Sequence, residues 1–150
     1  MKRRFFVQAI ASLAGTAMLA PHLMAQARPQ VEVWKDPNCG CCKDWVVHME
    51  ANGFDVKVHD SGNTAARKRL GVPDKLGSCH TALVGGYAIE GHVPAREVHR
   101  LLKEKPVAVG LSVPGMPVGS PGMEVPGRPA DKYDVVTFDR KGKTGVYTSR

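Results

Sequence analysis

The sequence predicts a mixed α/β domain, and three observations support this prediction. Short strand-like runs alternate with segments whose apolar residues recur at helical spacing. Two apolar runs flank Gly85-Gly86, which is a strong signal for an antiparallel hairpin. A chain of 150 residues with 43% hydrophobic content is long enough for one domain with a single core, and it shows no solenoid-length repeat.

Seven elements are expected in the body of the domain. Trp45, Val46 and Met49 recur at helical spacing and place a helix after the first strand. Because a crossover helix joins the first two strands, they should pair in parallel with a right-handed connection. In chain order we expect a strand at 31–34, a helix from Cys42 to the Asn-Gly stop at 52–53, a strand at 55–59, a short basic helix from Asn63 or Thr64 to Gly71, strands at 81–84 and 87–90, and a helix from Pro94 to Pro106.

The last third of the chain is predicted to be a Gly/Pro-rich loop followed by a hairpin. Residues 111–129 contain too many glycines and prolines for a regular helix or a central strand, so we expect an ordered or flexible loop. A terminal hairpin of residues 135–138 and 145–148 should pack this loop back onto the body. The mature chain is therefore divided into a main domain at 28–105 and an extension at 106–150.

Residues 1–27 are predicted to be a cleavable export signal. Three basic residues precede an apolar run at 5–20, and an Ala-Gln-Ala site follows at 25–27, a pattern too short and wrongly flanked for a spanning helix. The Arg-Arg-Phe-Phe-Val stretch at 3–7 resembles the twin-arginine pattern of bacterial signals, and the general secretory route is an equal alternative. The mature protein is expected in the periplasm, with no membrane span.

The charge of the chain argues against a nucleic-acid partner. Three of the 21 Lys and Arg residues lie in the signal, so 18 remain against 14 acidic residues and the mature chain has a net charge of +4. The remaining basic residues are scattered, with no aromatic interleaving and no reading helix. We interpret them as a solvated surface.

Four cysteines give the strongest functional signal. Cys39, Cys41 and Cys42 lie within four residues at the predicted start of a helix, and Cys79 lies beside His80 before a different strand. A bridge between the adjacent Cys41 and Cys42 would need strained disulfide geometry, and a structural zinc ion normally takes its cysteines in separated pairs. Sulfurs that cannot all converge on one ion can bridge several. The packing therefore favours a multinuclear thiolate cluster, and Cu(I) is the metal that prefers such donors.

Other interpretations of the cysteines stay open. One or two structural disulfides are the simplest alternative in an oxidising compartment. Cys39 and Cys42 also make a C-x-x-C pair, which suits a periplasmic thiol-disulfide oxidoreductase with Cys39 attacking and Cys42 resolving. A zinc-stabilised structural module would draw four ligands from the cysteines and His80.

Two histidines and two methionines are weaker candidates for the same site. His80 is adjacent to Cys79 and suits a metal ligand or a hydrogen-bonding partner of one. His92 lies at a strand-to-helix turn, where a surface position is the default expectation and a position facing the site is the alternative. Met116 and Met123 lie in the Gly/Pro loop, where each thioether is either a Cu(I) donor or a clamp that packs the loop onto the body.

The order of elements resembles that of thioredoxin-like domains. Cys39 and Cys42 stand where that fold has its C-x-x-C, between the first strand and the first helix. The resemblance implies that the loop at residues 79–81 packs against this pair. In thioredoxin-like proteins that loop usually contains a cis proline, whereas here it holds a thiol and an imidazole.

Several separate motifs together resemble the CopG-like family of bacterial periplasmic copper-resistance proteins, formerly a domain of unknown function. The motifs are the export signal, C-G-C-C at 39–42, G-x-C-H-T-A at 77–82, G-H-V-P-A at 91–95 and V-P-G-M-P-x-G-S-P-G-M-E at 113–124. The resemblance implies a thioredoxin-like metal-binding domain at 28–105 with a cysteine-bridged cluster of more than one copper ion. Its ligands would be Cys39, Cys41, Cys42 and Cys79. It also implies redox activity on copper and a role in copper resistance beside periplasmic copper chaperones or efflux components.

Overall fold

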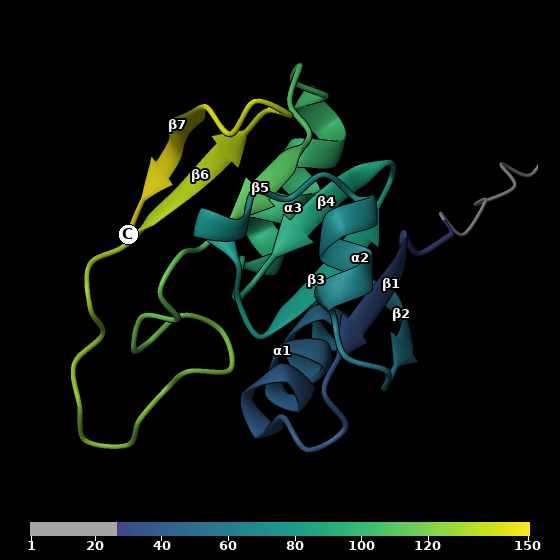
Figure 1. Ribbon diagram of the computed structural model, residues 1–150. Helices are drawn as coiled ribbons and strands as arrows, with labels where there is room; N and C mark the ends of the chain where they lie inside the picture. Colours follow the sequence, from purple (N-terminus) through teal and green to yellow (C-terminus); the bar gives the residue numbers. More distant parts are fainter. Residues whose placement is uncertain (1–26) are drawn as a thin grey trace, which may run out of the picture.

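The computed structural model describes residues 27–150, which form seven strands, three α-helices and one short 3-10 helix (Figure 1). The predicted export signal therefore lies outside the described residues, except for Ala27. The elements are, in chain order, β1 (Gln30–Lys35), α1 (Gly40–Ala51), β2 (Asp55–His59), α2 (Thr64–Arg69), η1 (Asp74–Leu76), β3 (His80–Val84), β4 (Tyr87–Glu90), α3 (Ala95–Glu104), β5 (Gly110–Ser112), β6 (Asp134–Phe138) and β7 (Thr144–Ser149).

The seven strands form one mixed sheet in the order β2-β1-β3-β4-β5-β6-β7. The predicted parallel pairing of β1 and β2 and the predicted β3–β4 hairpin are both confirmed. β1 also pairs with β3 in antiparallel, with Lys35 opposite His80. The end of β1 therefore lies beside the start of β3, which brings the residues after β1 close to Cys79. The predicted α/β class is confirmed, while the thioredoxin likeness stays a prediction.

One prediction about the C-terminal third was wrong. The loop was expected to begin at residue 111, but Gly110–Ser112 form strand β5. This strand pairs with β4 in parallel and with β6 in antiparallel, so the terminal hairpin continues the main sheet. A Cβ at Gly110 would lie 1.7 Å from the carbonyl oxygen of Ala88. Only glycine lets the two backbones approach this closely, so the short strand depends on the residue type that usually weakens strands.

Both faces of the sheet have a hydrophobic core. On one face α1 and α3 pack over the strands through fully buried side chains such as Trp45 and Leu101. On the other face a smaller cluster around Phe138 joins the segment after α2 to β4 and β6. Figure 1 shows α2 in front of the sheet and α3 behind it. Because the inner face of α1 is buried, its first turn is held beside the end of β1 and the start of β3.

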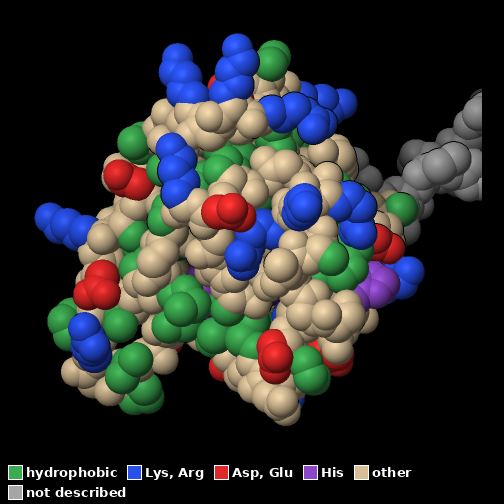
Figure 2. All heavy atoms as spheres, in the orientation of Figure 1, with side chains coloured by type: hydrophobic (Ala, Val, Ile, Leu, Met, Phe, Trp, Pro, Cys, Tyr) green, Lys and Arg blue, Asp and Glu red, His purple; other side chains and the backbone are tan. Residues whose placement is uncertain are grey.

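The face seen in Figure 2 has charged side chains of both signs, with Lys and Arg mostly over its upper half. Hydrophobic side chains lie mainly toward the lower half of this view. Among the described residues, no helix has the length and apolar character needed to cross a membrane.

Candidate metal centre

Three cysteines project from the first turn of α1. Cys39 is the residue that caps the helix, and a turn fixes it because its N–H donates to the carbonyl of Asp36 at 3.1 Å. The Asp36 side chain accepts a further bond from the N–H of Asn38 at 2.8 Å. The helix is anchored by Trp45, which is fully buried and donates from Nε1 to the carbonyl of Val93 at 2.9 Å. The sequence thus places a rigid helix start directly beneath the cysteines, as predicted.

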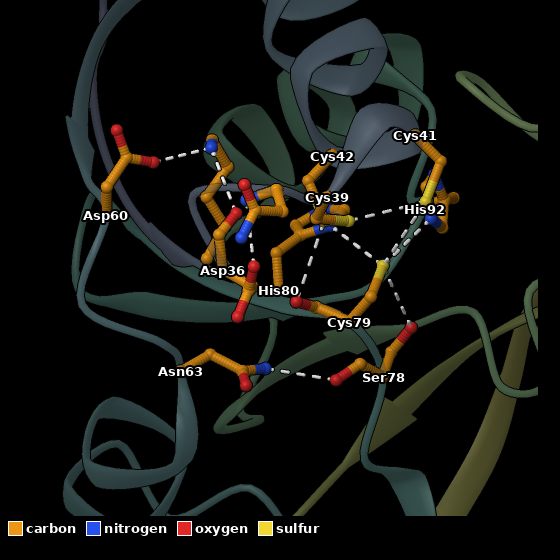
Figure 3. Close-up of a disulfide and its surroundings, with 12 residues drawn as sticks. Asp36, Cys39, Cys41, Cys42, Asp60, Asn63, Ser78, Cys79, His80 and His92 are labelled. Atoms are coloured by element: carbon orange, nitrogen blue, oxygen red, sulfur yellow. Dashed lines mark hydrogen bonds and ion pairs between the residues drawn. A yellow bond between two sulfur atoms is a disulfide. The ribbon is translucent and has the colours of Figure 1, made fainter.

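Cys39 and Cys42 form a disulfide, with their Cα atoms 5.3 Å apart, and Cys41 and Cys79 are free thiols. Cys41 Sγ lies 3.5 Å from Cys39 Sγ and 3.9 Å from Cys79 Sγ. Cys42 Sγ lies 3.6 Å from the carbonyl oxygen of Cys79. Figure 3 shows Cys41 and Cys79 pointing toward each other from α1 and from the loop before β3. The fold therefore gathers all four sulfurs, with the C-x-x-C pair in its oxidised form.

Two histidines complete the cluster. Cys79 Sγ lies 3.4 Å from Nδ1 of His80 and 3.1 Å from Nε2 of His92. The donor atoms form two groups, each with its atoms within 4.8 Å of one another: one group is Cys39, Cys41, Cys42 and Cys79, and the other is Cys79, His80 and His92. Cys79 belongs to both groups, so its sulfur can bridge two neighbouring ligand sets.

The default expectation of a surface position for His92 was wrong. The side chain is fully buried, and its Nδ1–H donates to the carbonyl of Pro121 at 2.8 Å. Because a carbonyl can only accept, this bond places the proton on Nδ1 and leaves the Nε2 lone pair facing Cys79. A second protein group that fixes the tautomer in this way is a common feature of histidine ligands.

Burial governs the protonation of these groups. It lowers the pKa of His80 to about 3, with the nearby His92 adding to the shift. It also lowers the pKa of His92. For Cys79, burial raises the pKa of the thiol, and the neighbouring Cys41 raises it further. Both imidazoles are therefore neutral and able to donate a lone pair, whereas the Cys79 thiol must lose its proton when a metal ion binds.

One ring nitrogen of His80 lacks a hydrogen-bonding partner within residues 27–150. Its ring is buried with its centroid 4.4 Å from that of Trp45 and 5.0 Å from that of His92. Nδ1 faces Cys79, while Nε2 has no hydrogen-bond partner among the described residues. A buried polar atom without a partner is unfavourable, and such exceptions in native structures often mark a site for an ion or another bound group. The donor set of sulfurs and neutral imidazoles suits a soft or borderline metal.

The Gly/Pro loop lies against this site through Pro121 and Gly122. Gly122 has a φ of 86°, and a Cβ there would lie 2.6 Å from the carbonyl oxygen of Cys41. Met123 follows directly and is partly buried, whereas Met116 is 40% exposed. The part of each methionine in metal binding stays a prediction, because the loop contacts involve the backbone of Pro121 and Gly122.

Comparisons with known proteins agree with this geometry. A family profile described as "Protein of unknown function, DUF411" matches residues 76–123, which include Cys79, His80 and His92. Two solved structures, described as Form 2 and Form 1 of "Copper resistance protein copG", are each 48% identical to this chain. Each match covers 82% of this chain and 98% of the other, with TM-scores of 0.76 and 0.75. A search of curated proteins finds no match. Identity of 48% over nearly the whole length of these structures shows that the chain belongs to the CopG family of copper resistance proteins.

Proposed function

We propose that this protein binds Cu(I) in copper resistance, as a multicopper cluster bridged by Cys39, Cys41, Cys42 and Cys79. The observation that carries the proposal is the gathering of four sulfurs and two imidazoles into two groups that share Cys79. Thiolates and neutral imidazoles together are donors for copper, and thiolates in particular favour Cu(I). The two similar structures are described as copper resistance proteins, which supports a role in copper resistance.

More than one ion is expected because the sulfurs come from neighbouring positions. Cys41 and Cys42 are adjacent in α1, and their side chains leave the helix in different directions: Cys42 is fully buried and Cys41 is not. One tetrahedral ion takes only four ligands, whereas six donor atoms gather here in two groups. A sulfur that bridges two ions, as we propose for Cys79, would let both groups take part.

The disulfide links copper binding to redox state. A disulfide sulfur has no thiolate charge, so the complete ligand set exists only after two electrons and two protons convert the Cys39–Cys42 bond to two thiols. Bound copper can exchange electrons with the same pair, since oxidation of the two thiolates to the disulfide releases the two electrons that convert two Cu(II) ions to Cu(I). We therefore include Cu(I)/Cu(II) interconversion in the proposal.

We place this activity in the periplasm, with copper chaperones or efflux components as partners. The support is the signal-like composition of the first 27 residues and the copper-resistance description of the similar structures. A fusion of residues 1–27 to a reporter that is active only after export tests the location. Reporter activity supports the proposal, and its loss on replacing the basic residues at 2–4 is expected.

Anaerobic titration of the reduced protein with Cu(I) tests the cluster. We expect more than one copper per chain, with a lower ratio in Cys41→Ser and Cys79→Ser. Ser78→Ala is the matched control, because the Ser78 hydroxyl lies 4.0 Å from Cys79 Sγ and the substitution keeps all four thiols. Saturation at one copper per chain, or unchanged binding in both cysteine variants, contradicts the cluster.

A second candidate function, thiol-disulfide exchange, is favoured by the Cys39–Cys42 disulfide itself. Cys39 is partly exposed and Cys42 is fully buried, which suits an attacking and a resolving thiol. The Cys39 thiolate would attack a substrate disulfide, break its S–S bond, release one substrate sulfur as a thiolate and form a mixed disulfide with the other. Cys42 would then attack Cys39 Sγ, release the substrate as a thiol and restore the observed bond.

Trapping separates this candidate from copper binding. If exchange occurs, Cys42→Ser accumulates a mixed disulfide at Cys39, and the reduced protein accelerates the reduction of insulin. A dedicated copper site predicts neither trapping nor insulin reduction. It predicts instead that the protein binds more than one copper ion per chain. Zinc at one ion per chain in freshly purified protein would instead support a structural zinc module.

A further inference from the structure

We infer that Glu90 positions Cys79 for metal binding, through a buried hydrogen-bond network that joins β4, α2 and the loop before β3. The inference rests on the proposed function, because it concerns the same site. Glu90 is the last residue of β4, and its side chain lies on the sheet face that α2 covers.

The network holds the residue that precedes Cys79. Ser78 lies just outside β3, so the strand pairing of β3 does not fix its backbone. Its N–H donates to Oε1 of Glu90 at 2.6 Å. Its carbonyl accepts from Nδ2 of Asn63 at 3.0 Å, drawn in Figure 3, and from Nη2 of Arg67. Side chains from two other elements thus bind both backbone polar groups of Ser78 and determine where the loop places Cys79.

Glu90 holds the cysteine loop on both sides. Its carboxylate is fully buried and accepts from Thr81 Oγ1 at 2.6 Å as well as from Ser78. Nε of Arg67 donates to the same carboxylate at 3.0 Å and supplies the compensating positive charge. Ser78 and Thr81 flank the Cys79-His80 pair in the sequence. One carboxylate therefore fixes the backbone before the pair and the side chain after it.

The chain that follows Glu90 supplies the imidazole that faces Cys79. The N–H of Gly91 donates to the carbonyl of His80 at 3.1 Å. A Cβ on Gly91 would lie 2.7 Å from Oγ of Ser78, so the two segments are in close contact. Residues 90–92 therefore lie directly against residues 78–80. The 3.1 Å approach of His92 Nε2 to Cys79 Sγ depends on this contact.

A buried ion pair is a weak source of net stability, because desolvation offsets much of its attraction. An apolar pair of the same volume could hold α2 on the sheet equally well, but it could not bind the N–H of Ser78. The use of a carboxylate at residue 90 is explained by the geometry of Cys79 rather than by stability. Removal of the carboxylate leaves Arg67 and the N–H of Ser78 without this acceptor, so a loss of stability is expected together with the effect on Cys79, and a second buried glutamate is needed as a control.

The chain contains a matched control for this test. Glu97 in α3 is also buried and also paired with arginine, through Arg96 at 3.2 Å and Arg150. Among the described residues, the Glu97 side chain makes no hydrogen bond to residues 78–81. Glu90→Ala and Glu97→Ala remove the same chemical group from similar surroundings, and only the first removes it from the cysteine loop.

The first measurement needs no copper. In a Cys41→Ser background with the Cys39–Cys42 disulfide intact, Cys79 is the only free thiol, so its alkylation rate reports its exposure. We expect Glu90→Ala to raise this rate at least tenfold and Glu97→Ala to leave it within twofold. Glu90→Gln should restore the slow rate, because its amide can accept from Ser78 and donate to Thr81. Equal rates in Glu90→Ala and Glu97→Ala, or a Gln variant as fast as Ala, overturn the inference.

If Glu90→Ala does not fold, Asn63→Ala provides the same test without leaving a buried charge. It removes one of the donors to the Ser78 carbonyl, and we expect a rise of several-fold in the alkylation rate of Cys79. If the alkylation rate of Cys79 in Asn63→Ala equals the rate in the protein that keeps Asn63, the inference is also overturned.

Copper competition is the second measurement. With a Cu(I) chelator as competitor and all four cysteines present, Glu90→Ala should bind at least tenfold more weakly, about 1.4 kcal/mol, and Glu97→Ala should bind normally. Normal Cu(I) affinity in Glu90→Ala overturns the inference. If the parent protein binds no copper, the proposed function fails, while the metal-free alkylation rates still decide whether Glu90 positions Cys79.

Discussion

Replacing His80 with Phe should make the metal-free protein more resistant to acid. The His80 ring is fully buried against Trp45, and its Nε2 has no hydrogen-bond partner among the described residues. Burial, with a contribution from His92, lowers the pKa of His80 from 6.5 to about 3. A phenyl ring keeps the contact with Trp45 and introduces no group that gains a proton.

The sign and size of the effect follow from proton linkage. Between pH 6.5 and 3 the unfolded chain binds a proton at His80 that the folded protein does not. Because folding lowers the pKa of His80, the unfolding free energy is unaffected by this residue above pH 6.5 and decreases as the pH falls toward 3. At 1.36 kcal/mol per pH unit, this one group costs about 2 kcal/mol of unfolding free energy between pH 7 and pH 5.

The assay is denaturant unfolding of the metal-free wild type and His80→Phe at pH 7, 6 and 5. His92, the other buried imidazole beside the ring, is present in both proteins, so the difference between the two curves reports on His80. We expect the variant to gain about 2 kcal/mol relative to the wild type between pH 7 and pH 5. Parallel curves over this range would refute the conclusion that burial keeps His80 neutral.

Two further outcomes test the site and the loop over it. Without reductant, alkylation should modify only Cys41 and Cys79, and after reduction it should modify all four cysteines, as counted by mass spectrometry. Four alkylated cysteines without reductant would exclude the disulfide. Gly122→Ala should lose about 1–3 kcal/mol more unfolding free energy than Gly127→Ala. Gly127 shares the positive φ, but its added Cβ would meet no atom of residues 27–150 within 4 Å. Equal losses would show that the loop does not press on the first turn of α1.

The body of the fold could be predicted from local patterns because its elements have strong local signals. The Gly85-Gly86 turn specifies the β3–β4 hairpin within ten residues, and the Trp45 periodicity specifies α1. β5 has no such signal, because three residues cannot show a period. Its pairing with β4 depends on the close approach at Gly110 and on β6, which lies more than twenty residues later. Contacts of this kind are decided by tertiary structure.

In the candidate site, too, the residues that are close in sequence could be predicted, whereas those that depend on tertiary contacts could not. Cys39, Cys41 and Cys42 are close in sequence, and the C-x-x-C spacing allowed for the disulfide that the structure contains. The burial of His92 could not be read from its Gly-His-Val-Pro surroundings, because it depends on Pro121 in a distant loop. Glu90 was also missed. A carboxylate that ends an otherwise apolar strand usually faces water, and only the fold brings Arg67 and Ser78 to it.

Copper X-ray absorption on protein reduced and loaded without oxygen tests the central claim most directly. The cluster predicts Cu(I) with mainly sulfur neighbours, a second copper close to the first, and more than one copper per chain. Loss of the copper–copper signal in Cys79→Ser is expected, since Cys79 is the sulfur shared by both donor groups. A single copper with nitrogen and oxygen neighbours, unchanged in Cys79→Ser, would contradict the cysteine-bridged cluster.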